Sequence, residues 1–354
     1  MDRHGGKNQS KGSLVLRLLM LAVFAGGGMA ACGTTPAPPP SDPPLPTDCR
    51  RVQHLEGETQ ICGQPETIAA LAAAPLELLL VLETQPAGLA NYATWHRDRY
   101  DNPSQQIPYL GQFVTSQPVN LGLTSQPSIE AIARLQPDLI VGTEGNVAQY
   151  ETLSAIAPTI LVSANDDDSD TSLRAVAQAL DRTDSVEQII TEKQQQVVAT
   201  REVFASVVAE HPNLLVLGAV QWKELYLGDR DYGLCSALLE DMGFQLIVPP
   251  GLESDVPNAP IRISHETLSQ LNDADSVIMF AGNLDEFDSQ GDFAEHQSSH
   301  IKQAWEQDAI AQSLDASKAG RVYFIPGYLC RGLPGPIGTE LYLQELQKQL
   351  FAPD

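Results

Sequence analysis

Short apolar runs alternate with longer segments of helical periodicity along most of the chain. Glycine, proline and polar clusters separate the two kinds of segment. The strands expected from the apolar runs are residues 67–71, 86–90, 139–141, 159–162, 214–218, 245–248, 275–280 and 321–325. The expected helices are residues 75–82, 127–136, 147–156, 172–180, 184–210, 234–242, 304–312 and 338–350, with one more starting at Ser264. Strands that alternate with helices predict an α/β fold with doubly wound parallel sheets.

The clearest passage of helix and strand lies between Ser125 and Gly142. Pro127 suits the first turn of a helix, where the missing N–H would have no partner. Pro137 ends the helix, because the residue before a proline is disfavoured in the α region. Residues 139–141 are apolar without interruption, as a strand covered on both faces requires.

This passage resembles the class III periplasmic binding proteins, the ferric siderophore and vitamin B12 receptors of ABC importers. The resemblance rests on residues 126–130 (Q-P-S-I-E) and 136–140 (Q-P-D-L-I), and it extends over about residues 62–351. The stretch 320–332 is similar to the siderophore branch, although that branch tends to have a tryptophan where Cys330 stands. The resemblance implies two lobes, each a parallel β-sheet flanked by helices, with a ligand cleft between them.

One long segment, residues 184–210, has no internal glycine or proline. As a helix it would reach about 39 Å at about 1.5 Å per residue. The pattern alone is equally compatible with an ordinary surface helix. The resemblance implies that it joins the two lobes as one long rigid helix.

The first residues are typical of a targeting segment. Basic residues precede the apolar run 18–25, which is too short to span a bilayer. The sequence Met29-Ala30-Ala31-Cys32 is similar to a bacterial lipobox, which predicts lipidation of Cys32; a plain signal peptide with an incidental cysteine is the alternative. The expected organisation is a signal peptide (1–31), a proline-rich tether (32–61), an N-terminal lobe (62–170), connecting helices (171–210) and a C-terminal lobe (211–354).

The charge of the chain excludes one class of partner. Its 45 acidic and 21 basic residues give a net charge of −24. Because phosphates are bound by Lys and Arg, such a chain is not expected to bind nucleic acid.

Four cysteines remain besides Cys32. An even number in an exported chain predicts disulfides, with Cys49–Cys62 as the better pair and Cys235–Cys330 as a second pair that follows from parity. A zinc site is less expected, because the chain contains no C-x-x-C.

Polar and aromatic residues follow several predicted strands, at the sheet edge where α/β proteins bind ligands. Aromatic rings and guanidinium groups together suit an anionic, partly aromatic chelate. Local packing of the rings and solvation of the arginines is the alternative for each residue. The predicted ligand-binding residues are Tyr92, Trp95, Arg97, Arg99, Tyr100, Ser125, Gln126, Glu144, Trp222, Tyr226, Arg230, Tyr232, Asn283, Tyr328 and Arg331.

The resemblance also implies two glutamates that dock the permease, one on each lobe. By their motifs these are Glu130 and Glu240. A solvated helix glutamate is the alternative at each position, because exposed ion pairs contribute less than ~1 kcal/mol.

A bare-metal site is the rival kind of ligand site. His296 and His300 are four residues apart, a spacing that would place both rings on one face of a helix, but their polar surroundings favour a solvated loop. No enzyme motif is present: G-x-S-x-G, a phosphate loop and H-E-x-x-H are all missing from the sequence.

The sequence therefore predicts a lipid-anchored substrate-binding protein, without a cofactor, that delivers a ferric siderophore to an ABC permease and its ATPase. Cobalamin, heme and bare metal (zinc, manganese or iron) remain alternatives. Thr124 stands where cobalamin binders tend to have an aromatic residue, which favours a siderophore. The protein is expected to be a monomer at the bacterial cell envelope, facing the periplasm or the outside.

Overall fold

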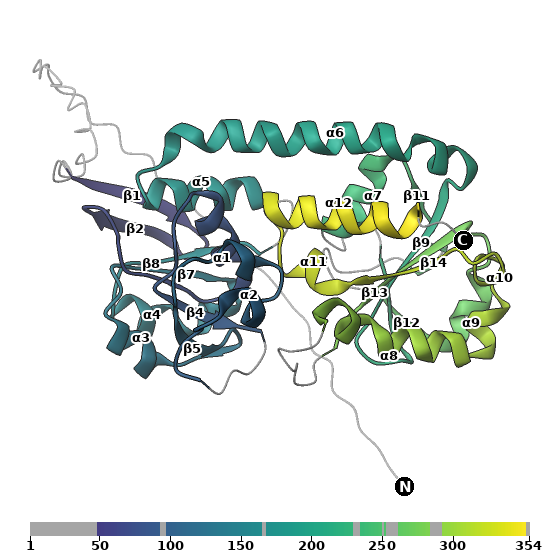
Figure 1. Cartoon of the computed structure of the whole chain (residues 1–354), viewed down its shortest axis with the longest axis horizontal. Coiled ribbons are helices and arrows are strands. Elements are labelled where there is room, and N and C mark those ends of the chain that lie inside the picture. The colour runs from purple at the N-terminus through teal and green to yellow at the C-terminus, as the bar shows by residue number, and fades with distance from the viewer. Residues whose placement is uncertain are drawn as a thin grey trace, which may run out of the picture. The chain divides into compact units, whose positions relative to one another are not determined.

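The structure is a computed structural model that describes residues 48–92, 97–164, 168–228, 234–249, 251–252, 261–283 and 292–351. All of these residues belong to one compact unit, residues 45–354. Within it, two α/β lobes each contain one six-stranded sheet (Figure 1). The predicted fold class is confirmed.

The N-terminal sheet has the strand order β6-β5-β4-β3-β7-β8. Its strands are parallel except for β6, which pairs antiparallel with β5 at the edge. The strands are β3 (Ile68–Ala70), β4 (Gly88–Asn91), β5 (Val119–Leu123), β6 (Gln126–Pro127), β7 (Leu139–Thr143) and β8 (Thr159–Val162). The helices of this lobe are α1 (Ala73–Val81), α2 (Pro103–Gln106), α3 (Ile129–Leu135), α4 (Tyr150–Ser154) and α5 (Ser169–Ala179).

The C-terminal sheet has the order β12-β10-β9-β13-β14, and β11 pairs with β9. The neighbouring strands β9, β13 and β14 are parallel, whereas β10 runs antiparallel to both β9 and β12. The strands are β9 (Asn213–Ala219), β10 (Glu224–Leu227), β11 (Gln245–Leu246), β12 (Ile261–Ser264), β13 (Ser276–Ala281) and β14 (Val322–Pro326). The helices are α7 (Leu234–Met242), α8 (Phe293–Gln307), α9 (Ala309–Ser313), α10 (Asp315–Lys318), α11 (Gly327–Arg331) and α12 (Pro336–Leu350).

Alternate residues of the strands face different cores. In β9, Leu215 and Leu217 pack with Trp305 of α8, whereas Leu214 and Val216 belong to the largest core of the protein. That largest core also contains Leu76 of α1, so it runs without interruption from one lobe into the other.

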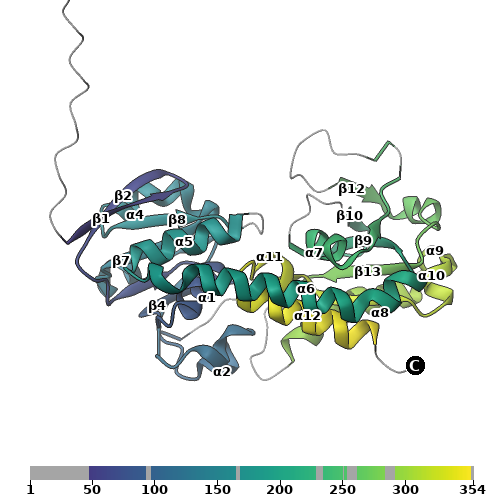
Figure 2. The same ribbon diagram turned by 90° about the horizontal axis from the view of Figure 1, so that it is seen from above.

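Helix α6 (Val186–Glu210) spans both lobes. Its 25 residues extend about 37 Å at ~1.5 Å each. It packs on α5 of the N-terminal lobe and on α7 and α12 of the C-terminal lobe, and α12 lies beside it in both views (Figures 1 and 2). The predicted long helix is therefore present.

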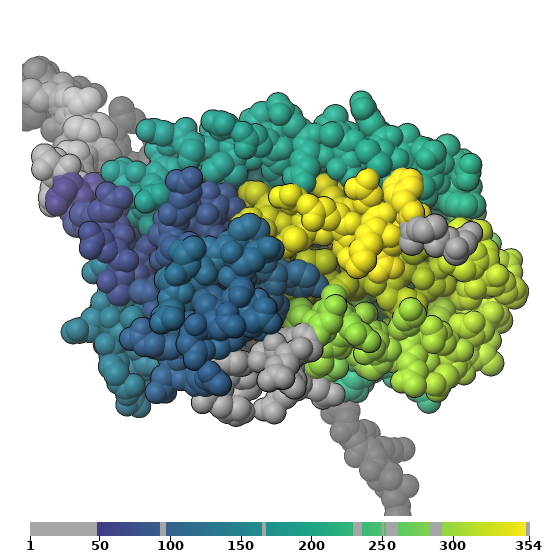
Figure 3. All heavy atoms as spheres, viewed as in Figure 1, coloured from purple at the N-terminus to yellow at the C-terminus, as the bar shows by residue number. Residues whose placement is uncertain are grey.

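A buried carboxyl group joins α1 to the start of α12. The side chain of Glu77 is fully buried and accepts hydrogen bonds from the amides of Gly335 (2.9 Å) and Gly338 (2.6 Å). Unpaired N–H groups at the start of a helix favour such an acceptor. Figure 3 shows α12, in yellow, meeting the blue N-terminal lobe at the surface.

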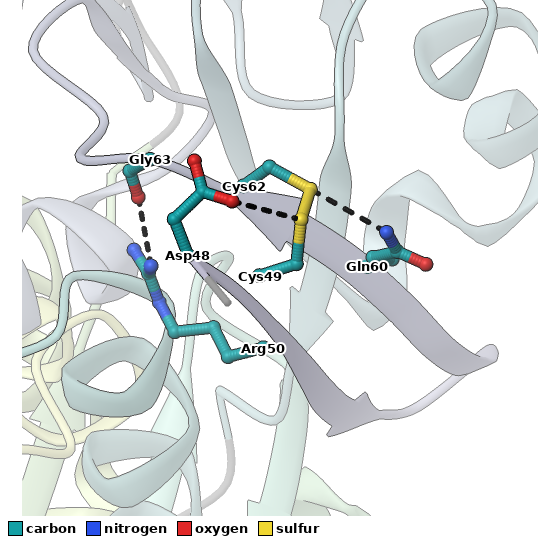
Figure 4. Close-up of a disulfide and its surroundings, with 6 residues drawn as sticks. All are labelled: Asp48, Cys49, Arg50, Gln60, Cys62 and Gly63. Atoms are coloured by element: carbon teal, nitrogen blue, oxygen red, sulfur yellow. Dashed lines mark hydrogen bonds between the residues drawn. A yellow bond between two sulfur atoms is a disulfide. The ribbon is translucent and has the colours of Figure 1, made fainter. Parts of the chain in front are cut away.

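The predicted tether 32–61 is wrong in its last part. Strands β1 (Cys49–His54) and β2 (Gly57–Cys62) form an antiparallel hairpin that packs on β8 and α5. Successive side chains of a strand point to opposite faces, and on the inner face Val52 and Ile61 are buried. Cys49 lies opposite Cys62 and the two form a disulfide, the pair that the sequence predicted (Figure 4). The Arg50 guanidinium closes the base of the hairpin by donating to the Gly63 carbonyl (2.7 Å).

Several expected boundaries were also wrong. Pro127 pairs in β6 and precedes the helix, and Ser128 is the N-cap of α3, accepting from the Ala131 amide (3.2 Å). Ser264 bonds to the Thr267 side chain, at the start of a 3₁₀ helix (His265–Gln270) rather than an α-helix. The segment expected as helix 304–312 is two helices, α8 and α9, separated by Asp308, which caps α9.

Within the described ranges, no helix is both long and apolar enough to cross a membrane.

Candidate functional site

A cavity of about 350 Å³ lies where strands of both sheets end. Residues at or just beyond the carboxyl ends of β3, β4, β7 and β8 line it from the N-terminal lobe, and those of β9, β13 and β14 line it from the C-terminal lobe. This is the edge at which α/β sheets place their ligands.

Apolar atoms form most of the cavity wall. The small and aliphatic lining residues are Ala72, Ala73, Ala74, Ala164, Ala219, Val220, Gly282, Gly327 and Gly332. The aromatic lining residues are Tyr92, Tyr226, Phe280 and Tyr328. The polar lining residues are Thr124, Thr143, Gln297 and Arg331. An apolar wall with a few polar groups is typical of a small-molecule site.

Aromatic contacts connect the two lobes beside the cavity. Tyr92 meets Tyr328 edge to face with ring centroids 5.9 Å apart, and the Tyr92 hydroxyl donates to the Asn283 carbonyl (3.2 Å). Tyr109 stacks on Tyr328 at 6.0 Å and meets Phe293 at 5.7 Å. Burial raises the pKa of Tyr92 and of Tyr328, so both phenols remain protonated near neutral pH.

Among the described residues that line the cavity, Arg331 is the one with a charged side chain. It ends α11, a short helix that follows β14, in a stretch that the sequence predicted to be a loop. Its side chain is exposed, whereas Tyr328 and Cys330 of the same helix are buried. An exposed arginine that lines the cavity can pair with an anionic group of a ligand.

Four of the predicted ligand-binding residues line the cavity: Tyr92, Tyr226, Tyr328 and Arg331. Four others lie next to it. Asn283 holds Tyr92 through its carbonyl, and Glu144 accepts from the Ala164 amide (2.9 Å). Ser125 and Gln126 follow Thr124 and are exposed, Ser125 in a turn and Gln126 at the start of β6. Trp95, Arg230 and Tyr232 are outside the described residues.

The remaining predicted ligand residues lie elsewhere, which corrects the expectation for them. Tyr100 is fully buried in the N-terminal lobe. Trp222 packs edge-on against Trp305 (5.9 Å) and His265 (5.6 Å), because burying its ring in the C-terminal core removes apolar surface from water.

Arg97 and Arg99 line a second hollow in the N-terminal lobe, together with Glu130 and Arg134. The loop that carries them returns along the sheet edge, where Arg99 bridges to Val119. Arg97 pairs with Asp101 at 2.9 Å. They are therefore not part of the cavity wall.

The two histidines lie on α8, so the expectation of a loop is wrong. Asp292 caps this helix by accepting from the amides of Ala294 (2.8 Å) and Glu295 (3.2 Å). His300 Nε2 bonds to the Val220 carbonyl (2.9 Å), and the His296 ring stacks on Phe293. Across the described ranges, no three His, Cys, Asp or Glu side chains group as metal ligands would.

The predicted docking glutamates are on helices of different lobes. Glu130 is in the first turn of α3, exposed and paired with Arg134 (2.6 Å). Glu240 is half-buried on α7.

The sequence analysis missed most of the small and polar cavity residues, including the alanines after β3 and Gln297 of α8. Ala72, Ala73 and Ala74 continue directly from the first strand and offer no chemistry that would single them out. Gln297 lies between the two histidines in the sequence and was not predicted as a ligand residue. It is buried, and its Nε2 donates to the Asn283 carbonyl (3.1 Å). The end of the preceding strand was a signal for the three alanines, whereas Gln297 lies within α8 and no strand end marks it.

Cys330 takes part in a disulfide. The side chain of its predicted partner, Cys235, is outside what the structure describes, so that pairing stays a prediction. The proposed lipidation site Cys32 is also outside the described residues.

Comparison with known proteins identifies the family to which the chain belongs. Residues 68–329 match the periplasmic binding protein family. The Bacillus subtilis protein YhfQ, named as an ABC transporter substrate-binding lipoprotein, is 27% identical over 311 residues, which are 85% of this chain and 88% of YhfQ. The Fe(3+)-citrate-binding protein YfmC of Bacillus subtilis is 25% identical over 281 residues, 78% of each chain.

The same fold occurs in solved structures. SirA of Staphylococcus aureus, solved with staphyloferrin B, superposes with a TM-score of 0.65 at 20% identity, covering 85% of this chain and 98% of SirA. The petrobactin-binding protein YclQ of Bacillus subtilis gives a TM-score of 0.66 at 18% identity, covering 86% of this chain and 99% of YclQ. The chain belongs to the periplasmic binding protein family.

Proposed function

We propose that this protein is the extracytoplasmic substrate-binding component of an ABC importer and that it captures a ferric siderophore for iron uptake. The observation that carries the proposal is the cavity at the strand ends of both lobes, lined by aromatic rings and Arg331. The names of the relatives support the ligand class, since YfmC binds Fe(3+)-citrate and SirA was solved with staphyloferrin B.

The residues of the cavity suit a chelated iron rather than a bare ion. The rings of Tyr92, Tyr226 and Tyr328 would cover flat faces of a chelate, and Arg331 would pair with an anionic oxygen of it. The function is binding without catalysis, and the iron is cargo rather than a resident cofactor.

The partners follow from the same proposal. An ABC permease would dock on Glu130 and Glu240, and its ATPase would supply the energy of transport. Lipidation at Cys32 would anchor the protein to the envelope membrane, with residues between 33 and 47 as the tether, and the folded unit would act as a monomer. A disulfide between Cys235 and Cys330 would fix α11, which carries Tyr328 and Arg331, to α7.

Isothermal titration of the purified protein tests the ligand. We expect saturable binding of at least one ferric siderophore and no comparable binding of hemin, cobalamin, Zn²⁺ or free Fe³⁺. Arg331→Gln should weaken binding of an anionic chelate about tenfold, because it removes a charge-assisted hydrogen bond.

Lys302→Gln, an exposed change on α8 outside the cavity lining, is the matched control and should bind as the unchanged protein does. Binding of hemin, cobalamin or a bare ion in preference to every ferric chelate would refute the proposal.

A further inference from the structure

Tyr109 has a backbone conformation that a bulky residue rarely adopts. Its φ is 59° and its ψ is −50°, the strained form of a γ-turn. The Leu110 amide donates to the Pro108 carbonyl across this turn (2.6 Å). Residues that a fold keeps in such conformations occur most often at ligand clamps and active sites.

Buried neighbours fix this turn on the N-terminal lobe. Ile107 and Leu110, on either side of it, are buried in the core that both lobes share. The Gly111 amide donates to the Ile107 carbonyl (3.0 Å), and a Cβ at Gly111 would lie 2.0 Å from the Pro103 carbonyl oxygen. The chain therefore cannot relax the turn at Tyr109 without unpacking these neighbours.

The turn places the Tyr109 ring against the opposite lobe. The ring stacks on Tyr328 of α11, with centroids 6.0 Å and planes 23° apart, and it meets Phe293 of α8 edge to face at 5.7 Å. Phe293 also meets Tyr328 at 5.2 Å, so each of the three rings contacts the other two. Both ring contacts of Tyr109 are thus with the C-terminal lobe.

Tyr328 is the member of this group that lines the cavity, and Tyr109 is not among the lining residues. The buried hydroxyl of Tyr328 has no hydrogen-bond partner among the described residues, so packing against its neighbours must orient the ring. A wall residue that is already ordered costs a ligand less entropy on binding. Support of Tyr328 by Tyr109 should therefore raise affinity.

The ring of Tyr109, rather than its hydroxyl, makes this contact. The hydroxyl oxygen is buried and has no hydrogen-bond partner in the part of the chain that the structure describes. Burying an unpaired hydroxyl costs free energy, as the strained turn does. What the placement gains is the packing of the ring on Tyr328 and Phe293.

From the strained turn, its buried neighbours and the ring contacts across the lobes, we propose that Tyr109 is a positioning residue for the captured chelate. It holds the ring of Tyr328 in place at the cavity wall and does not touch the ligand. This inference rests on the proposed function and deepens it, because it assigns part of the affinity to a residue outside the cavity lining.

Variants of Tyr109 test the role of the ring. Isothermal titration with ferric citrate, a ferric tris-catecholamide and a ferric aliphatic tris-hydroxamate identifies the complex that the unchanged protein binds most tightly, and that complex is the probe. Tyr109→Gly and Tyr109→Ala both remove the ring and should each weaken binding about fivefold. Tyr109→Phe keeps the ring and should stay within about twofold.

Stability separates positioning from a merely structural role. Glycine adopts a positive φ without strain and alanine does not, so Tyr109→Gly should unfold at a higher urea concentration than Tyr109→Ala. A positioning role predicts the same loss of affinity in both variants. Affinity that followed the urea midpoint instead would overturn the inference. Because the two variants differ in strain, either one decides the role of the ring if the other does not fold.

A double variant tests whether Tyr109 acts through Tyr328. Tyr328→Leu removes the ring that Tyr109 supports, so adding Tyr109→Gly to it should change affinity by less than about twofold. A further fivefold loss would overturn this coupling. Phe113→Ala is the matched control: it removes an exposed ring of the adjacent 3₁₀ helix (Leu110–Phe113), outside the cavity lining, and should bind as the unchanged protein does.

The possible failures are distinguishable. Unchanged affinity in Tyr109→Gly and Tyr109→Ala would overturn this inference and leave the capture of ferric chelates intact. A loss in Tyr109→Phe as large as that in Tyr109→Gly would assign the effect to the hydroxyl and overturn the role of the ring. If the folded, unchanged protein bound none of the ferric complexes, the proposed function would fall and the inference with it.

Discussion

Glu77 is a buried carboxyl group whose protonation depends on the fold. Burial raises its pKa from the ordinary 4.5 to about 7, although the amides of Gly338 and Gly335 and the charge of Lys193 act in the opposite direction. The folded protein therefore keeps this proton up to about pH 7, while the unfolded chain releases it near pH 4.5.

The free energy of unfolding should reflect this difference. The stabilisation linked to Glu77 is complete below pH 4.5 and is lost as the pH rises through 7, so from pH 4.5 to 8 it should fall by about 3 kcal/mol. Urea unfolding of the unchanged protein and of Glu77→Gln, which cannot ionise, measures the effect as the difference between the two pH profiles.

Glu202→Gln on the exposed side of α6 is the control and should leave the profile unchanged. Parallel profiles for the unchanged protein and Glu77→Gln would show that Glu77 does not take up a proton on folding.

At the scale of single residues, the sequence predicted positions along the chain better than side-chain directions. Tyr92, Tyr226, Tyr328 and Arg331 were found because each lies close to the end of a strand or in the stretch that follows one. Trp222 had the same kind of position, but its ring turns into the core against Trp305. Glu77 could not be anticipated, because Gly335 and Gly338, which bind it, are about 260 residues away in the chain.

At the scale of elements, the hairpin of β1 and β2 is held at its base by the Cys49–Cys62 disulfide. Replacing both cysteines by serine should destabilise the hairpin by about 2–3 kcal/mol, because the unfolded segment regains the freedom of its closed loop. Amide hydrogen exchange of residues 49–62 should become faster, measured against exchange in α6.

Ligand binding, unlike hydrogen exchange in the hairpin, should not change when the two cysteines are replaced. No hairpin residue lines the cavity, so affinity for a ferric chelate should stay within about twofold. Unchanged exchange in the hairpin, or a large loss of affinity, would contradict this assignment.

The elements that the sequence predicted well are those with a strong period or an unbroken apolar run. Helix α7 matches its predicted bounds, and α6 begins two residues after its predicted start. Strands β5, β10 and β12 were missed because they are short and partly polar, and pairing with a neighbouring strand, rather than local pattern, makes them strands.

At the scale of the whole molecule, we predict that docking and ligand binding use different surfaces. Glu130 and Glu240 lie outside the cavity lining, on helices of different lobes. Replacing both by alanine should leave chelate affinity unchanged and abolish uptake in cells that contain the cognate permease, since both ion pairs to the permease would be lost.

The matched control replaces Glu192 and Glu202, two exposed glutamates of α6, and should transport normally. Normal uptake by the Glu130→Ala, Glu240→Ala variant would remove the docking role from these residues.

The two lobes themselves were predicted through resemblance and periodicity together, but their shared core was not. Periodicity shows which residues are buried and gives no information on whether Leu76 and Val216 belong to one cluster or two. Helices α6 and α12 both contact elements of the two lobes and so contribute to the continuity of the cluster.

This shared core has a consequence for how the chain can be divided. A fragment that ended at residue 210 would keep α1 and α6 but lose α12, and the apolar side chains that α12 covers would meet water. Neither lobe is therefore a module that could be produced or exchanged alone. Heating should melt both lobes in one transition, and a chimera with a relative should be joined within surface loops rather than between the lobes.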